Sequence, residues 1–233
     1  MPELPEVETT LRGISKKILN KEIKTFDLRT EKLRWPIDKG LKKFLKNKII
    51  KSAERRGKYI ILHLSESHLL IHLGMSGKLR VFKEQVPSKK HEHWDIKFVD
   101  GWTLRYTDVR KFGALIKITS DPEDHKLLKN LGPEPLGNYF NGLYLFEKTR
   151  NKTRPIKNLI MDSNIVTGVG NIYANEALFL AGIRPRKQSQ KLTKDNCNNL
   201  SQAIRQTLSE AIEAGGTTPV SYTHLRAHET IHY

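Results

Sequence analysis

The period of the apolar residues changes once along the chain, and this change limits the folds that the sequence can adopt. From about Lys21 to Ile118 apolar and polar residues alternate, which is typical of strands that bury one face. Beyond residue 137 the apolar spacing becomes helical. Residues 131–137, between the two regions, contain two prolines and two glycines, a composition that ends regular structure. The sequence therefore predicts an α+β protein with a sheet domain at residues 1–132 and an all-α domain at residues 133–218.

The first region is expected to form an antiparallel β-sandwich. Its strands are short, and Asp100-Gly101 is a hairpin signal between two of them. A barrel would satisfy the same alternation, but we expect a sandwich. The predicted strands are Glu22–Leu28, Ile49–Glu54, Tyr59–Leu64, Leu69–Leu73, Lys78–Phe82, Asp95–Val99, Thr103–Tyr106 and Ala114–Ile118.

Two helices are predicted with clear ends. Val7, Leu11, Ile14 and Ile18 recur at helical spacing, so a leading helix with one apolar stripe should end near residues 19–20. In the second domain the clearest helix has Thr193 as its N-cap, and a pair of glycines at positions 215–216 stops it. Its apolar positions are Cys197, Leu200, Ile204, Leu208 and Ile212.

The charge of the chain indicates a polyanionic partner. The formal net charge is +16 and the pI is near 9.8, with the basic residues in several short clusters. Nucleic acid is the simplest partner. An anionic membrane is the alternative, but no apolar run approaches the ~20 residues that a spanning helix needs. The N-terminus lacks the features of a secretory signal, and the one cysteine cannot form a disulfide framework, so we expect a cytoplasmic protein.

The N-terminal segment Met1-Pro2-Glu3-Leu4-Pro5-Glu6-Val7-Glu8 combines a candidate nucleophile with carboxylates. If Met1 is removed, Pro2 becomes a secondary amine with a pKa near the α-amino value of roughly 8. Such an amine is partly neutral at pH 7 and can form a Schiff base with a carbonyl-like carbon. Glu3 and Glu6 lie one helical turn apart and can face the same pocket. The alternative is a helix start whose acids only complement the helix dipole.

Three further turns contain candidate site residues. Arg55-Arg56-Gly57-Lys58 puts cations around a glycine, and the neighbouring charges would lower the pKa of Lys58. His72–Gly77 and Asp108–Gly113 are glycine-bounded turns that expose Met75, Arg110 and Phe112. An enzyme that flips a base out of duplex DNA can fill the gap with such side chains. A solvated basic turn and ordinary core packing are the respective alternatives.

The second domain contains a basic cluster and a glycine-opened helix. Five cations lie at positions 148–157 with no acid among them, namely Lys148, Arg150, Lys152, Arg154 and Lys157. Val166–Tyr173 follows, where glycines open a new helix whose free amides could bind phosphate beside the Asn171 side chain. A metal site at His91-Glu92-His93 is not expected, because a third well-spaced ligand is missing.

Taken together, these motifs resemble those of bacterial formamidopyrimidine-DNA glycosylase, a family that removes oxidised purines from damaged double-stranded DNA and then nicks the strand. The resemblance runs in order from Met1 to about Thr218. It implies that Pro2 attacks the sugar, that Glu3 protonates the ring oxygen and that Glu6 supports the pocket. Lys58 would contact phosphate and assist proton transfer.

The resemblance also assigns DNA contacts. His91 would touch the DNA backbone, and Met75, Arg110 and Phe112 would fill the gap that the flipped base leaves. The second domain resembles the helix-two-turn-helix element of the family, with Arg154, Lys157 and Asn171 on the phosphates. A monomer is expected.

The resemblance ends before the zinc finger of the family, which needs four cysteines. Cys197 is the one cysteine of this sequence, so no zinc, no other metal and no cofactor is expected. Residues 219–233 look unlike the family and are expected to be a non-native tail, and the spacing of His224, His228 and His232 receives little weight. Two functions stay open: a bifunctional glycosylase and abasic-site lyase, or a truncated DNA-binding remnant with weak or no excision. A basic RNA-binding protein comes third.

Overall fold

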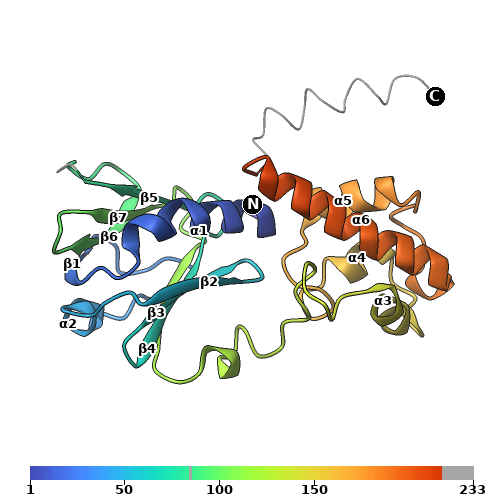
Figure 1. The fold of residues 1–233 in the computed structure, drawn as a ribbon, viewed down its shortest axis with the longest axis horizontal. Coiled ribbons are helices and arrows are strands. Elements are labelled where there is room, and N and C mark those ends of the chain that lie inside the picture. Colours follow the sequence, from blue (N-terminus) through green and yellow to red (C-terminus); the bar gives the residue numbers. More distant parts are fainter. Residues whose placement is uncertain (84–85, 217–233) are drawn as a thin grey trace.

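A computed structural model of the chain describes residues 1–83 and 86–216. The strands form one half of the molecule, and most of the helices form the other (Figure 1). This arrangement confirms the predicted α+β class. The predicted tail, with its three histidines, lies outside the described residues, and the domain limits at residues 132 and 218 stay predictions. None of the described helices has the length and apolar character that crossing a membrane requires.

Two four-stranded antiparallel sheets enclose the first hydrophobic core, as the alternating pattern predicts. One sheet has the order β1-β6-β7-β5 and the other the order β2-β3-β4-β8. Trp94, Tyr106, Phe26 and Phe98 are among the largest side chains buried in this half. The strands are β1 (Ile23–Leu28), β2 (Ser52–Arg56), β3 (Tyr59–Leu64), β4 (Ser67–His72), β5 (Lys78–Phe82), β6 (Glu92–Phe98), β7 (Thr103–Thr107) and β8 (Ala114–Ile118).

The largest correction to the predicted strands concerns β2. It begins at Ser52 and continues through Arg56, whereas the sequence predicts residues 49–54. Arg55 and Arg56 therefore belong to a strand, and they pair in register with Ile60 and Tyr59 of β3. The tight turn that joins the two strands contains Gly57, which has a positive φ of 58°. Apolar alternation alone misses this strand end, because its side chains are charged.

The leading helix α1 (Leu4–Ile18) connects the two halves. Val7, Leu11, Ile14 and Ile18 are buried in the core of the sheet domain. Leu4, at the start of the same helix, is buried in the core of the helical domain instead. The predicted apolar stripe is confirmed, and Leu4, which was not part of that stripe, anchors the N-terminus to the second domain. The short helix α2 (Leu41–Leu45) packs beside β1.

The second domain contains α3 (Gly142–Thr149), α4 (Ile156–Ile160), α5 (Asn171–Leu180) and α6 (Lys194–Glu213). Two short 3-10 helices lie at Pro122–Asp124 and Ser189–Lys191. The predicted N-cap of α6 is confirmed, because the Thr193 side chain accepts a hydrogen bond from the Asn196 N–H at 3.1 Å. Helix α6 packs against α3, α5 and α1.

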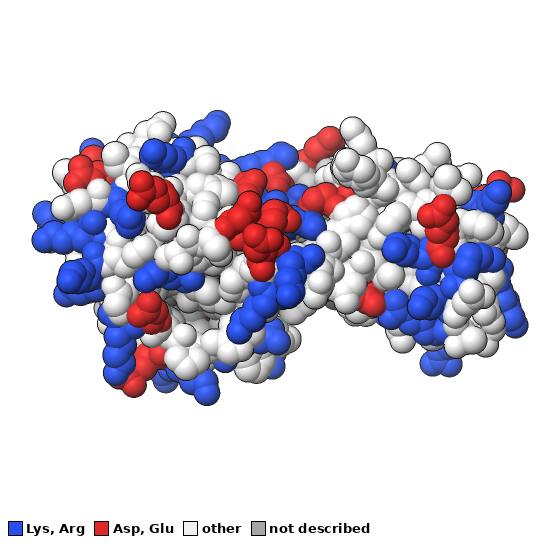
Figure 2. Space-filling model, turned by 90° about the horizontal axis from the view of Figure 1, so that it is seen from below, with Lys and Arg blue, Asp and Glu red and all other residues white. Residues whose placement is uncertain are grey.

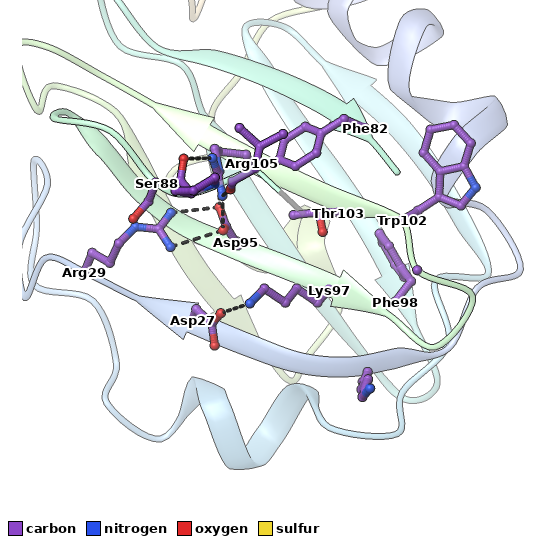
Figure 3. A pocket seen from close by; sticks show the side chains of 14 residues that line it. Asp27, Arg29, Phe82, Ser88, Asp95, Lys97, Phe98, Trp102, Thr103 and Arg105 are labelled. Carbon is purple, nitrogen blue, oxygen red and sulfur yellow. Dashed lines mark hydrogen bonds and ion pairs between the residues drawn. The ribbon is translucent and has the colours of Figure 1, made fainter. Parts of the chain in front are cut away.

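A buried ion network occupies the outer face of the β1-β6-β7-β5 sheet, at the wall of a pocket of about 490 Å³ (Figure 3). The Arg105 guanidinium donates to both Asp95 carboxylate oxygens at 2.8 Å, and Arg29 also donates to Asp95. Burial alone would raise the pKa of Asp95, but the hydrogen bonds from the two arginines outweigh it and lower that pKa. The network contains none of the predicted site residues, so it is a structural feature of the sheet.

The Asp95→Ala variant should lower the free energy of unfolding by about 2–3 kcal/mol, because Arg105 loses the acceptor of two buried hydrogen bonds and keeps Glu92 as its remaining carboxylate partner. Asp27→Ala is the matched control in the same pocket. The Asp27 pair with Lys97 is half-exposed, and its loss should change that free energy by no more than about 1 kcal/mol. Urea unfolding of the two variants measures both values, and equal effects would contradict this account.

The pH dependence of the same variant has a definite sign. Because the folded-state pKa of Asp95 is lowered, its contribution is present above the unfolded value of roughly 3.9 and is lost as pH falls through the folded value. The stability difference between wild type and Asp95→Ala should therefore shrink in acid.

Candidate active site

Three segments that are distant in sequence meet at the N-terminus of the chain. The Leu4 N–H donates to the Gly168 carbonyl at 3.1 Å, which joins the start of α1 to the segment before α5. A Cβ on Gly57 would overlap the Thr167 side chain, so the β2–β3 turn packs on that segment as well. Residues 2–6, the turn at 57–58 and residues 167–173 therefore form one site.

Glu3 lies at the centre of this site and is 3% exposed. Its carboxylate accepts hydrogen bonds from the backbone N–H groups of Gly170 at 2.8 Å and Ile172 at 2.9 Å. Burial raises the pKa of Glu3 and is the largest influence on it, although these hydrogen bonds and the charge of Lys58 act in the opposite direction. The side chain is thus held firmly, and it keeps a proton to a higher pH than an ordinary glutamate.

This contact corrects the prediction that the amides at the start of α5 are free for phosphate. The Glu3 carboxylate already caps that helix N-terminus from the other end of the sequence. A carboxylate is well suited there, because the first N–H groups of a helix have no intrahelical acceptor. The Asn171 side chain, which is exposed, remains available at the same helix start.

Glu6 fixes the backbone that precedes α1. Its carboxylate accepts a hydrogen bond from the Glu3 N–H at 2.9 Å and another from the Tyr173 hydroxyl at 2.6 Å. Pro2, the predicted nucleophile, is half-buried and directly precedes Glu3. Glu6 therefore links the backbone at Glu3 to the Tyr173 side chain of α5. Its role in supporting the pocket stays a prediction.

Lys58 follows the glycine of the β2–β3 turn and faces the two glutamates. Burial lowers the pKa of Lys58, while the charges of Glu3 and Glu6 raise it and oppose this effect. The lowered pKa of Lys58 agrees with the sequence-based expectation. The expected cause, repulsion from Arg55 and Arg56, is wrong. Those two arginines donate hydrogen bonds to the carboxylate of Glu134 instead.

A pocket of about 400 Å³ opens beside Lys58 between the two domains. Tyr59, His72 and Gly168 also line it. The Nδ1 atom of His72 accepts a hydrogen bond from the Gly74 N–H at 3.0 Å, and burial is the main reason that the pKa of His72 falls to about 4. His72 is therefore neutral at pH 7. The sequence places His72 at the start of a candidate turn and does not indicate its place in this pocket.

The predicted gap-filling side chains lie on two loops that touch each other. Met75, between β4 and β5, is 40% exposed, and Phe112, between β7 and β8, is 45% exposed. The Arg110 guanidinium lies 4.9 Å from the centre of the Phe112 ring. A Cβ on Gly74 would overlap the backbone of Phe112, so the loops are in close contact. The structure thus brings together all three residues that the sequence predicts.

Asp108 connects these two loops and was not among the predicted site residues. It is fully buried, and one carboxylate oxygen accepts hydrogen bonds from the Ser76 hydroxyl at 2.5 Å and the Arg110 N–H at 3.2 Å. The other oxygen accepts from the Gly113 N–H at 2.9 Å and the Tyr106 hydroxyl at 3.0 Å. The position of Asp108 directly before two exposed residues of a turn could have indicated such a role, since Asp side chains commonly accept from turn amides.

The remaining predicted DNA contacts are spread over both domains. His91 is half-buried, has a positive φ of 70°, and its carbonyl accepts from the Asp108 N–H at 3.0 Å. It therefore adjoins the loop that contains Arg110. Lys157 lies on α4, and Arg154 pairs with Asp162 at 2.9 Å just before that helix.

The four-cysteine zinc site of the resembled family does not fit the described residues. Cys197 is buried in the core of the helical domain, and burial raises the pKa of its thiol. Within residues 1–83 and 86–216 no group of three or more His, Cys, Asp or Glu side chains is arranged to hold a metal ion.

Two family profiles match the chain in the order of its domains. The formamidopyrimidine-DNA glycosylase N-terminal domain matches residues 1–115, and the H2TH domain of the same enzyme matches residues 131–222. A sheet domain with this N-terminal site, followed by an H2TH domain, defines a DNA glycosylase of base-excision repair. More narrowly, the chain belongs to the formamidopyrimidine-DNA glycosylase family.

Individual relatives agree with this assignment. The formamidopyrimidine-DNA glycosylase of Teredinibacter turnerae is 50% identical over 219 residues, which are 94% of this chain and 80% of that protein. That of Legionella pneumophila strain Paris is 48% identical with the same coverage. Among solved structures, the Lactococcus lactis enzyme bound to DNA with an abasic site is 37% identical, with a TM-score of 0.87, and the match covers 94% of this chain and 85% of that chain.

The Asp108→Asn variant should loosen both gap-filling loops. An asparagine has one acceptor oxygen, so at least one of the four donors that face Asp108 loses its partner, which costs about 1–3 kcal/mol of unfolding free energy. Hydrogen exchange at the Arg110 and Gly113 amides should accelerate. Asp100→Asn, in an exposed hairpin, is the control and should leave the exchange at these amides unchanged.

Proposed function

We propose that this chain removes oxidised purines, such as formamidopyrimidines and 8-oxoguanine, from double-stranded DNA through a Schiff base on Pro2, and then cleaves the abasic site. The observation that carries the proposal is the burial of Glu3 and Lys58 beside the N-terminal residue that would supply the amine. Burial shifts both pKa values toward those of groups that exchange protons near neutral pH. The amine requires removal of Met1, which is part of the proposal.

The proposed chemistry begins at the flipped nucleotide. The Pro2 nitrogen attacks C1′, and the bond from C1′ to the base breaks with its electron pair on the base. The proton that the attacking nitrogen loses passes to the departing base. Glu3 donates its proton to the ring oxygen, so the C1′–O bond opens and an iminium ion forms between Pro2 and the sugar. The raised pKa of Glu3 supports this assignment, because it makes the protonated form more accessible than it is for an ordinary glutamate.

The lyase step follows from the charge of the iminium ion. The positive nitrogen acidifies the C2′–H bond, a base takes that proton, and the electron pair expels the 3′ phosphate by β-elimination. Water then hydrolyses the iminium and releases Pro2. Lys58 is proposed to contact the phosphate next to the lesion and to assist proton transfer, since its lowered pKa makes the neutral amine accessible.

DNA binding in this proposal uses both domains. Met75, Arg110 and Phe112 would fill the space left by the flipped base, at a cost of a few kcal/mol for unstacking and unpairing. His91, Arg154, Lys157 and Asn171 would contact backbone phosphates. The sequence-based expectations of a monomeric, cytoplasmic protein that uses no cofactor belong to the same proposal.

Borohydride trapping tests the Schiff base directly. Incubation with a duplex that contains 8-oxoguanine, in the presence of borohydride, should give a covalent adduct that peptide mass analysis locates on Pro2. Pro2→Gly should form a less stable adduct or none, whereas Lys58→Arg should still be trapped. Salt-sensitive DNA binding without any adduct would favour the alternative of a DNA-binding remnant.

The Gly170→Ala variant tests whether the position of Glu3 matters for the chemistry. The added Cβ would overlap the Glu3 carboxyl group, so the carboxyl must move. A displacement of about 1 Å can lower a rate on the order of 100-fold, and we expect such a loss in single-turnover base release.

Gly13→Ala is the matched control for this substitution. It adds a methyl group in the middle of α1, where nothing lies within 4 Å of the new atom. It should keep full activity and raise the unfolding free energy by about 0.5–1 kcal/mol. A Gly170→Ala protein with normal activity would show that the observed position of Glu3 is not needed.

A further inference from the structure

Two basic segments of the helical domain run side by side, although about 30 residues separate them in sequence. The Ile156 N–H donates to the Lys187 carbonyl at 2.9 Å, and the Gln190 N–H donates to the Lys152 carbonyl at 2.9 Å. A β-bridge between Pro155 and Gln188 lies between these two hydrogen bonds. The fold therefore combines the basic cluster that the sequence shows at residues 148–157 with a second one at residues 184–191.

Four cations on this paired segment are exposed, namely Lys152, Arg184, Arg186 and Lys191. Three of them, all but Lys152, line a shallow hollow next to α6. The nearest cation of the expected phosphate site, Arg154, is engaged by Asp162, whereas these four side chains make no hydrogen bond, ion pair or cation–π contact with any residue in the described part of the chain. Together they are called the basic track.

We propose that the basic track binds the phosphate backbone of duplex DNA outside the lesion site, without regard to sequence or damage. The track would hold undamaged DNA while the enzyme searches, and it would extend the contact surface once a lesion is bound. This inference goes beyond the proposed function, because no part of the chemistry at Pro2 requires these residues.

The position of the track favours DNA over another polyanion. The Lys157 N–H donates to the Pro185 carbonyl at 3.2 Å, so the track begins beside the residue expected on a phosphate near the lesion. A strand that leaves Lys157 can therefore continue onto the track without a gap. On the face seen in Figure 2, Lys and Arg side chains gather over the outer part of the helical half, with a few Asp and Glu side chains among them. A backbone with evenly spaced charges suits a basic surface.

The absence of base-reading features at the track indicates non-specific binding. Lys152, Arg184 and Arg186 lie on turns and irregular segments, and Lys191 ends a 3-10 helix of three residues, so none lies on a helix long enough to enter a DNA groove. Contacts of this kind act through the release of counterions, and each lowers the slope of log affinity against log salt by roughly 0.9.

The test compares a variant with four substitutions in the track with a control variant that has the same net charge. Lys152, Arg184, Arg186 and Lys191 are changed to Gln in the full chain, and the control changes Lys42, Lys43, Lys46 and Lys51 to Gln. The control lysines are exposed on and near α2, in the sheet domain. Dissociation constants for an undamaged 30-base-pair duplex are measured from 50 to 200 mM salt, and circular dichroism checks that both variants fold.

For the track variant, the slope of log affinity against log salt concentration should be shallower by about two to four. A change of this size corresponds to the loss of two to four phosphate contacts. The affinity lost between 50 and 200 mM salt then becomes roughly 10- to 150-fold smaller than in the wild type. The control should keep the wild-type slope. An unchanged slope in the track variant, or an equal change in both variants, would overturn the inference.

Borohydride trapping at low salt on a short abasic duplex separates this inference from the proposed function. The track variant should form the Pro2 adduct as the wild type does. If the wild type itself forms no adduct while the slope still differs between the two variants, the proposed chemistry is wrong and the track stands. If trapping of the track variant falls 10-fold or more at low salt, the residues belong to the lesion site and the inference is overturned.

Discussion

The contact between the Glu3 carboxylate and the first amides of α5 determines how the molecule is assembled. It joins residue 3 to residues 170 and 172, and it is buried from solvent. A buried carboxylate without donors would be strongly unfavourable, and a buried helix N-terminus without acceptors would be too. Each group therefore stabilises the other, and the two domains are held in one arrangement at the point where the N-terminus lies.

This arrangement explains how the chain can hold a residue so close to its end as Pro2, the proposed nucleophile, in a fixed position. The ends of polypeptide chains are usually poorly ordered unless other contacts hold them. Here Leu4 is buried among residues of the helical domain, and the Glu3 N–H donates to Glu6. The backbone is thus fixed one residue after Pro2, and only a short stretch of chain remains free to move. The position of the proposed amine therefore depends on packing that involves both domains.

The sequence predicts the elements better than the contacts between them. Alternation and helical spacing locate most strands and helices, because these patterns depend on which face each residue buries. The joining of Glu3 to Gly170 could not be read from the sequence, since its partners are backbone amides 167 and more residues away. The same holds for Arg55 and Arg56, which look like free cations in the sequence but pair with Glu134 in the fold. Asp108 was missed because its four donors come from three segments.

Burial also links the two ionisable groups of the site. It raises the pKa of Glu3 and lowers that of Lys58, so the difference between the two values becomes smaller than in water. Proton transfer costs less free energy as the pKa values of two groups approach each other, which suits the proposed reaction, in which one proton is first donated and another is later removed. The mutual attraction of the two charges opposes these shifts but does not reverse them. The enclosure of the site between the domains, more than any single neighbouring charge, therefore prepares these residues for acid–base chemistry.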